Sequence, residues 1–138
     1  MSFVLDSSVA LTWCFEDERT EATDALLERV TESGAIAPML WPLEVLNGLA
    51  MAERRGRLDA QRRHRMTGLL QTLPVTIDSE TVRHAWQVTA YLAERFGLTV
   101  YDAAYLELAQ RTHLELATLD QQLRAAGAAV GVPLLGAE

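Results

Sequence analysis

In SFVLDSSVA (residues 2–10), a short apolar run ends at Asp6, and a helix-like pattern through residue 14 begins directly after it. The same order recurs near the end of the chain, where LELATLD (residues 114–120) ends at Asp120 and a helical pattern follows over residues 121–126. A buried strand that leads through an acid into a helix is the first half of a β-α-β unit. We therefore expect an α/β fold, a three-layer α/β/α sandwich around a mostly parallel sheet of about five strands.

The other elements fit this alternation. Short apolar runs predict further strands at residues 35–37, 74–77 and 132–135, and helical patterns cover residues 20–31, 43–52, 78–95 and 99–112. No linker, repeat or low-complexity segment interrupts the pattern, and 138 residues suffice for one core. A single domain over residues 1–138 is expected.

Charge and composition exclude several classes of protein. The formal net charge is −7, which argues against a general electrostatic clamp on nucleic acid. It does not exclude a nucleic-acid enzyme, because acids gathered around metal ions are neutralised when the metal binds. All 12 basic residues are arginine. The absence of lysine excludes a phosphoacceptor receiver domain and a P-loop enzyme, and no Gly-x-Gly-x-x-Gly follows the first strand.

The composition also indicates the cellular compartment. Cys14 is the only cysteine, so no internal disulfide can form, and a reducing cytoplasm is the expected compartment. No apolar run approaches the roughly 20 residues of a membrane span, and the first residues lack the basic region of a signal peptide. We expect no membrane association.

Four acids stand at equivalent places in this predicted fold. Asp6 and Asp120 follow strands, and Glu44 and Asp102 lie in the first turns of helices. In a parallel sheet the carboxyl ends of the strands and the start of the following helices meet at one edge, where ligands bind. Each acid alone is also explained as a helix cap, since aspartate is favoured there. Together they predict a carboxylate cluster.

Such a cluster favours one kind of chemistry. Neighbouring carboxylates raise one another's pKa and repel, and a divalent cation removes this penalty; hard oxygen ligands select Mg²⁺ or Mn²⁺. Carboxylate-held metal ions are the usual device for phosphodiester cleavage. The hydroxyls of Ser8 and Thr118 are suited to orient the acids, although simple capping and strand positions explain both equally well. No His cluster for zinc and no Ser-His-Asp or Cys-His pattern competes.

The helix that carries Asp102 has a clear pattern. Thr99 is its expected N-cap, and the face that begins at Asp102 continues through Tyr105, Leu106 and Ala109 into the core. Glu107 is expected to point away from this face into solvent.

Arginines concentrate between residues 54 and 65, on both sides of a helix–turn–helix break. A solvated helix pair and a phosphate-contacting surface are both compatible with them, because guanidinium groups bind phosphate in a bidentate manner. The residues are Arg54, Arg55, Arg57, Arg62, Arg63 and Arg65.

Four blocks of this chain resemble the signature blocks of the PIN-domain family, in order and at similar spacing. They are VLDSSVAL (residues 4–11), PLEVLN (42–47), YDAAYLELA (101–109) and ATLD (117–120). The resemblance covers residues 3 to 124, and the size and layout are similar to the free-standing VapC-type toxins.

The resemblance implies an Mg²⁺- or Mn²⁺-dependent endoribonuclease, in which a metal-bound water attacks an RNA phosphodiester in line and leaves a 5′-phosphate. It makes Asp6, Glu44, Asp102 and Asp120 the metal-binding acids, with Ser8 and Thr118 in support and Asn47 at a position where the family often has asparagine. It also implies a homodimer and a small antitoxin that wraps the apolar helices near the site. Two alternatives stay open: a non-catalytic binding module of the same fold, and a metal-dependent nuclease that acts on DNA.

Overall fold

The computed structural model describes residues 2–137 and contains one five-stranded sheet. The spatial order is β3-β2-β1-β4-β5, and each neighbouring pair is parallel. The predicted α/β class and strand number are confirmed. The strands are β1 (Val4–Leu5), β2 (Ala35–Ala37), β3 (Val75–Ile77), β4 (Leu116–Ala117) and β5 (Leu134–Leu135).

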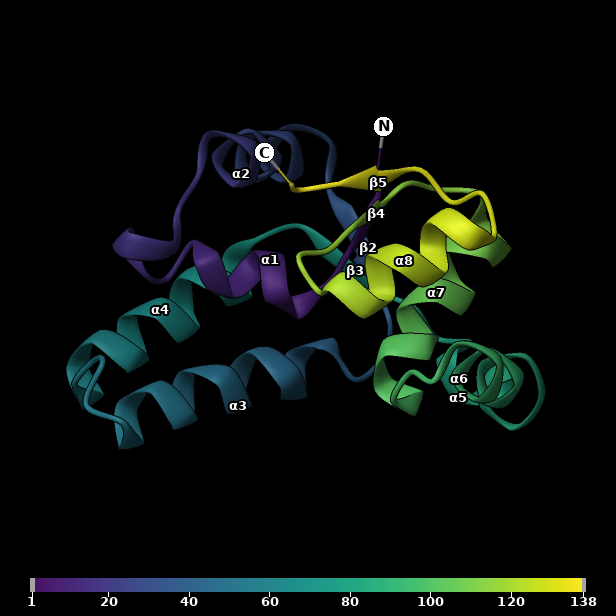
Figure 1. The fold of residues 1–138 in the computed structure, drawn as a ribbon. Helices are drawn as coiled ribbons and strands as arrows, with labels where there is room; N and C mark the ends of the chain where they lie inside the picture. The colour runs from purple at the N-terminus through teal and green to yellow at the C-terminus, as the bar shows by residue number, and fades with distance from the viewer. Residues whose placement is uncertain (1, 138) are drawn as a thin grey trace.

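The helices form the two outer layers, with α2 over one face of the sheet and α7 against β1 and β4 on the other (Figure 1). Side chains of Thr20, Asp59, Thr99 and Asp120 cap the helices that follow them, as local sequence favours. The helical elements are α1 (Ser7–Thr12), η1 (Glu16–Glu18), α2 (Glu21–Ser33), α3 (Trp41–Arg54), α4 (Ala60–Thr72), α5 (Thr81–His84), η2 (Ala85–Thr89), α6 (Ala90–Phe96), α7 (Val100–Thr112) and α8 (Gln121–Ala129).

Some predicted boundaries differ from the structure. The helix expected over residues 78–95 begins only at Thr81, because the Asp78 side chain is a buried ion-pair partner of Arg111 and not a cap. The helix is also interrupted by the π-helical turn η2. The strand expected over residues 114–119 is restricted to Leu116–Ala117. Its shortness lets residues 118–120 leave the sheet and turn toward α8.

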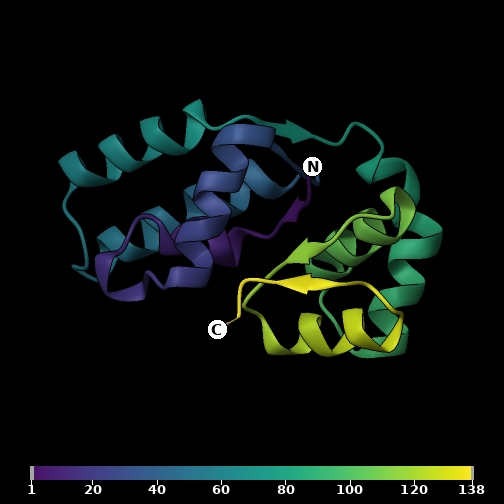
Figure 2. The same ribbon diagram turned by 90° about the horizontal axis from the view of Figure 1, so that it is seen from above.

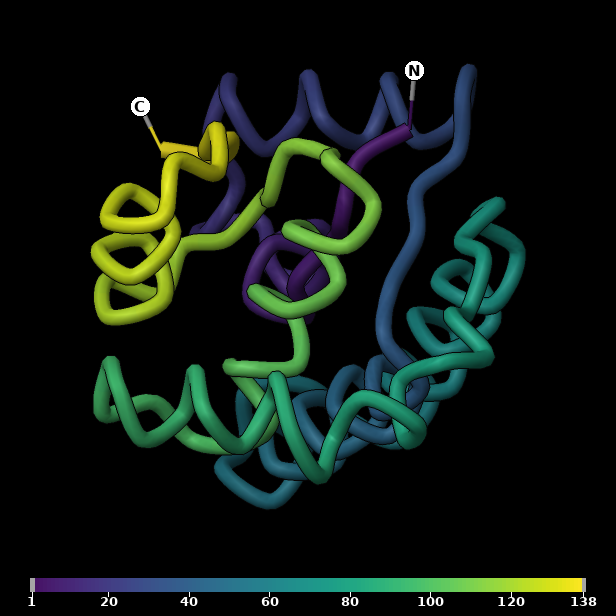
Figure 3. Tube along the Cα trace, turned by 90° about the vertical axis from the view of Figure 1, so that its right-hand side faces the viewer, coloured from purple at the N-terminus to yellow at the C-terminus, as the bar shows by residue number. Residues whose placement is uncertain are grey.

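The hydrophobic core surrounds β1 and α7. Phe3, Val4 and Leu5 are fully buried, as expected of a central parallel strand covered on both faces. Helix α7 is covered by the sheet, by α8 and by the bent helix α5–η2–α6, and every residue from 103 to 109 is buried. In Figure 3, α2 crosses the top of the molecule, and α6 runs along the opposite side.

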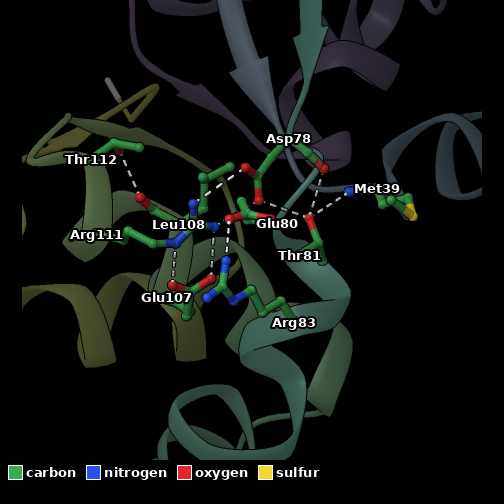
Figure 4. Close-up of polar contacts among 9 residues, drawn as sticks. All are labelled: Met39, Asp78, Glu80, Thr81, Arg83, Glu107, Leu108, Arg111 and Thr112. Atoms are coloured by element: carbon green, nitrogen blue, oxygen red, sulfur yellow. Dashed lines mark hydrogen bonds and ion pairs between the residues drawn. The ribbon is translucent and has the colours of Figure 1, made fainter.

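The expectation that Glu107 points into solvent is wrong. Its side chain is 3% exposed, and Arg111, one turn later on α7, donates to both of its carboxylate oxygens (Figure 4). The error has a physical reason: the helical pattern identifies one apolar face, but α7 is enclosed on several sides. A buried acid is tolerated there because an arginine neutralises it.

Helices α3 and α4 form a hairpin that extends to one side of the sheet, with α1 packed against α3 (Figures 1 and 2). The turn between them includes Gly56, whose φ of +76° is one that a residue with a side chain rarely adopts. Within residues 2–137, none of the helices has the length and apolar character needed to cross a bilayer.

Candidate active site

The sheet order reverses between β1 and β4. From β1 the chain continues outward through β2 to β3, and it then returns to place β4 and β5 on the other side of β1. Ligands of open α/β sheets bind at this kind of switch point, outside the carboxyl ends of the strands. Leu5 pairs with Ala117 in register, so Asp6 and Thr118 leave the two central strands side by side.

Asp6 is held in place by two hydroxyls. Its side chain is 3% exposed, and its Oδ2 accepts hydrogen bonds from Ser8 Oγ and Thr118 Oγ1, both at 2.7 Å. Burial raises the pKa of the Asp6 carboxyl, the two hydroxyl bonds lower it, and the charge of Asp120 raises it again. The two bonds use one carboxylate oxygen, and the other oxygen, Oδ1, accepts only a long 3.5 Å bond from Ser7 Oγ.

The same hydroxyls fix the loop after β4. Ser8 Oγ accepts the backbone N–H of Leu119 at 3.0 Å, and Thr118 Oγ1 accepts that of Asp120 at 3.1 Å. A hydroxyl has one proton, and each of these is then available for Asp6. The loops after β1 and β4 are thereby locked to each other through side chains 112 positions apart.

Glu44 reaches the site from the first turn of α3. Its Oε1 accepts the Tyr105 hydroxyl at 2.6 Å and the Ser7 hydroxyl at 3.2 Å. Burial raises the pKa of the Glu44 carboxyl, the Tyr105 bond lowers it, and the nearby charge of Asp6 raises it. Burial and the charges of Asp6 and Glu44 raise the pKa of the Tyr105 hydroxyl, which therefore stays protonated as a donor.

Asp102 and Asp120 complete the acidic group. Burial, followed by the charges of Asp120, Asp6 and Glu44, raises the pKa of Asp102 to about 6. Asp102 therefore lies in the electrostatic field of all three other acids. Asp120 caps α8, and its Oδ1 accepts the backbone N–H of Leu123 at 2.8 Å. The backbone N–H of Asp102 is capped by Thr99 Oγ1, as the sequence predicts.

The donor set fits a hard divalent ion. Mg²⁺ in proteins keeps several of its waters and is held through one or two carboxylates, with phosphate oxygens from the substrate. Within residues 2–137, no three His, Cys, Asp or Glu side chains form a ready-made cage. The pKa values of Asp6, Glu44 and Asp102 are nevertheless each raised in part by the charge of a neighbouring acid. A bound cation would relieve this repulsion. A loosely spaced carboxylate group suits a hydrated Mg²⁺ or Mn²⁺ better than a closed structural site.

Sequence reasoning missed two residues of this site, Ser7 and Tyr105. Tyr105 was assigned to the core, which is correct for its ring, but its hydroxyl is one of two donors to Glu44. A signal existed, because a buried tyrosine hydroxyl needs a partner and Tyr105 follows Asp102 by one helical turn. Asn47, by contrast, lies exposed on α3, one turn after Glu44.

The arginine cluster lies around the α3–α4 turn and is partly neutralised by the protein. Arg57 pairs with Asp17 and Glu18, and Arg63 pairs with Glu53. Arg62 donates to the Cys14 carbonyl at 3.4 Å and Arg54 contacts the Met51 sulfur at 3.7 Å. Arg55 and Arg65 are exposed, and among the described residues neither has an ion-pair partner.

The family model for the PIN domain matches residues 3–129, which include all four acids. The chain belongs to the PIN-domain family. A curated relative, ribonuclease VapC3 of Pyrobaculum aerophilum, is 32% identical over 127 residues, which cover 89% of this chain and 92% of that protein.

Solved structures of the same fold agree with this PIN domain over nearly its whole length. The crystal structure of PAE2754 from Pyrobaculum aerophilum superposes with a TM-score of 0.66 at 24% identity and covers 91% of this chain and 84% of that one. VapBC2 from Rickettsia felis, solved with a DNA fragment from its promoter, gives a TM-score of 0.66 at 11% identity and 97% coverage of both chains. At these identities the likeness concerns the fold.

Proposed function

We propose that this PIN domain is an endoribonuclease that depends on Mg²⁺ or Mn²⁺, and that it is the toxin of a toxin–antitoxin pair. The observation that carries the proposal is the meeting of four carboxylates from four separate segments at the switch point of the sheet. The relative named ribonuclease VapC3 supports RNA as the substrate.

The roles proposed for the four acids follow from their surroundings. Asp6 would offer Oδ1 to the ion, since its Oδ2 is occupied by Ser8 and Thr118. Glu44 would be held in place by the Tyr105 hydroxyl. Asp102 and Asp120 would bind through the remaining oxygens. When bound, a divalent ion supplies an activated water and stabilises the leaving oxygen. The expected products carry 5′-phosphate and 3′-hydroxyl ends.

The acidic site repels RNA phosphates, so binding of RNA requires positively charged side chains nearby. The proposed surface is the arginine cluster of residues 54–65, and Arg55 and Arg65 are its most available members because neither is neutralised within the described chain. The pairing of Arg57 and Arg63 with acids reduces their expected contribution.

The enzyme is tested by cleavage of end-labelled structured RNA with Mg²⁺, Mn²⁺ or EDTA. The wild type should give discrete, metal-dependent cuts that Asp102→Asn loses. Glu28→Gln, which neutralises an exposed acid on α2, serves as the matched control and should cut like the wild type. Equal cutting by wild type and Asp102→Asn, or products with 2′,3′-cyclic phosphate ends, would contradict the proposal. Single-stranded DNA assayed in parallel identifies a DNA nuclease instead.

The proposed antitoxin has a suitable surface. A groove of about 360 Å³ lies between α3, α4 and β3 and is lined mainly by apolar side chains, among them Trp41, Val45, Leu46 and Leu70. The toxin–antitoxin complex named VapBC2 supports such a partner. Leu46→Glu should weaken binding of the protein encoded by a small upstream gene, whereas Leu69→Glu, on α4 outside the groove, should not.

A homodimer is also proposed, and exposed apolar residues support it. Val82, Trp86 and Tyr91 on the bent helix and Val100 and Tyr101 at the start of α7 are each more than half exposed. A concentration of large apolar side chains on one part of a protein surface is typical of an interface.

A further inference from the structure

A second group of buried charges is formed by residues outside the acidic site. Asp78 and Glu107 are 7% and 3% exposed, and Arg111 bridges them. Arg111 Nη2 lies 2.6 Å from Asp78 Oδ2, and its Nε lies 2.7 Å from Glu107 Oε2 (Figure 4). Glu107 accepts two guanidinium bonds and so fixes the plane of Arg111, whose other edge then faces Asp78.

The group continues through a hydroxyl to the loop before α3. Thr81 Oγ1 donates to Asp78 Oδ2 at 3.0 Å and accepts the backbone N–H of Met39, also at 3.0 Å. Figure 4 shows Thr81 between Asp78 and Met39. Since the Met39 N–H can only donate, the single proton of the hydroxyl is directed at Asp78, whose Oδ2 lies at 3.0 Å and whose backbone carbonyl lies at 3.2 Å.

The loop held in this way leads directly to Glu44. Met39 lies in the short connection between β2 and α3, and the backbone N–H of Glu44 bonds to the next carbonyl, that of Leu40, at 3.0 Å. Helix α7 therefore holds the start of α3 at two points. Arg111 acts through Asp78 and Thr81 on Met39, and Tyr105 bonds directly to Glu44.

We propose that Arg111, Asp78 and Thr81 are positioning residues for Glu44, because they hold the loop at residues 38–40 in the place that brings Glu44 to the Tyr105 hydroxyl. Glu107 orients Arg111 for this task. The catalytic consequence of the inference rests on the proposed function, whereas the positioning itself concerns only the folded chain.

The sharpest test leaves the buried ion pairs intact. Loss of Arg111 or Asp78 would leave an uncompensated buried charge, which is strongly destabilising. Thr81→Val removes only the hydroxyl that joins Met39 to Asp78 and keeps the size of the side chain. Thr89→Val is the matched control, because Thr89 is on the same bent helix, is 2% exposed, and its hydroxyl has no hydrogen-bond partner within the described chain.

The first measurement is amide hydrogen exchange by NMR without metal. In Thr81→Val the amides of residues 39–41 and 43–45 should exchange about fivefold faster than in the wild type, while those of α4 stay unchanged. The ring signal of Tyr105, one of only three tyrosines, should shift. Thr89→Val should match the wild type in both. Unchanged exchange at residues 39–41 and 43–45 would overturn the proposal, even if the melting temperature of Thr81→Val fell.

The second measurement is the affinity for Mn²⁺ and the kinetics of RNA cleavage. Thr81→Val should weaken Mn²⁺ binding and lower kcat by about fivefold, with KM little changed, whereas Thr89→Val should do neither. Wild-type Mn²⁺ affinity and kcat in Thr81→Val, together with wild-type exchange, would mean a purely structural network. If the wild type itself cuts no RNA, the proposed function fails, and the metal-free exchange still decides the positioning.

Discussion

The hydroxyl of Tyr105 donates a 2.6 Å hydrogen bond to Oε1 of Glu44 and so joins α7 to α3 across 61 positions of sequence. The ring of Tyr105 is completely buried, which leaves its hydroxyl little freedom. Helix α7 thus serves the acidic site twice. Its first turn presents Asp102, and its second turn holds Glu44.

Replacement of Tyr105 by phenylalanine should shift the pH dependence of cleavage. The Tyr105 bond lowers the pKa of Glu44 against the effect of burial, so its loss raises that pKa. Glu44 would then be deprotonated only at higher pH, and the acid limb of the pH–rate profile should move upward. Stability should fall by about 1 kcal/mol, as for one lost hydrogen bond. Profiles of kcat/KM against pH check this, with Glu28→Gln as the control. An unshifted acid limb would show that the bond is unimportant.

Asp102→Asn should stabilise the metal-free protein while it abolishes cleavage. The pKa of Asp102 rises from 3.8 to about 6 on folding, so the folded state binds its proton more tightly than the unfolded state does. This contribution to stability is present below pH 4 and is lost as pH rises through about 6. The variant should therefore melt higher than the wild type at pH 7.5 in EDTA, with a smaller difference at pH 4. A wild-type melting temperature at both pH values would contradict the electrostatic account.

Binding of Mn²⁺ should release protons near pH 6 but not at pH 8. At pH 6 the Asp102 carboxyl is about half protonated, because its pKa is about 6, and a metal ion requires the ionised form. Calorimetric titrations in two buffers of different ionisation enthalpy measure the proton release directly. Asp102→Asn should release fewer protons than the wild type. The same heat in both buffers at pH 6 would contradict the account in which a half-protonated Asp102 loses its proton on metal binding.

Trp86→Glu should convert the proposed homodimer into a monomer. The side chain is 86% exposed, an unusual state for tryptophan, and a charge at the centre of an apolar interface is costly. Size-exclusion chromatography with light scattering measures the mass. Gln87→Glu places the same charge at the adjacent exposed position and should leave the dimer intact. A dimer that survives Trp86→Glu would place the interface elsewhere.

The sequence by itself determined the local features of this protein. Apolar runs that end at Asp6 and Asp120 specify strands followed by helices, and Thr99 and Asp120 are capping residues whose effect reaches only three positions along the chain. The α/β class and the four separate places of the acids follow from such short-range patterns, because burial and capping depend on neighbouring residues.

The tertiary structure alone decided which of these residues meet. The pairing of β1 with β4 places Thr118 beside Asp6, and the enclosure of α7 buries Glu107, which the helical pattern had assigned to solvent. The tertiary structure also places the hydroxyl of the buried Tyr105 where it donates to Glu44. Arg57 and Arg63 are paired with acids that no local pattern links to them. These contacts join residues that are far apart in sequence, and they are fixed by the crossover connections and the packing of helices, which no local pattern contains.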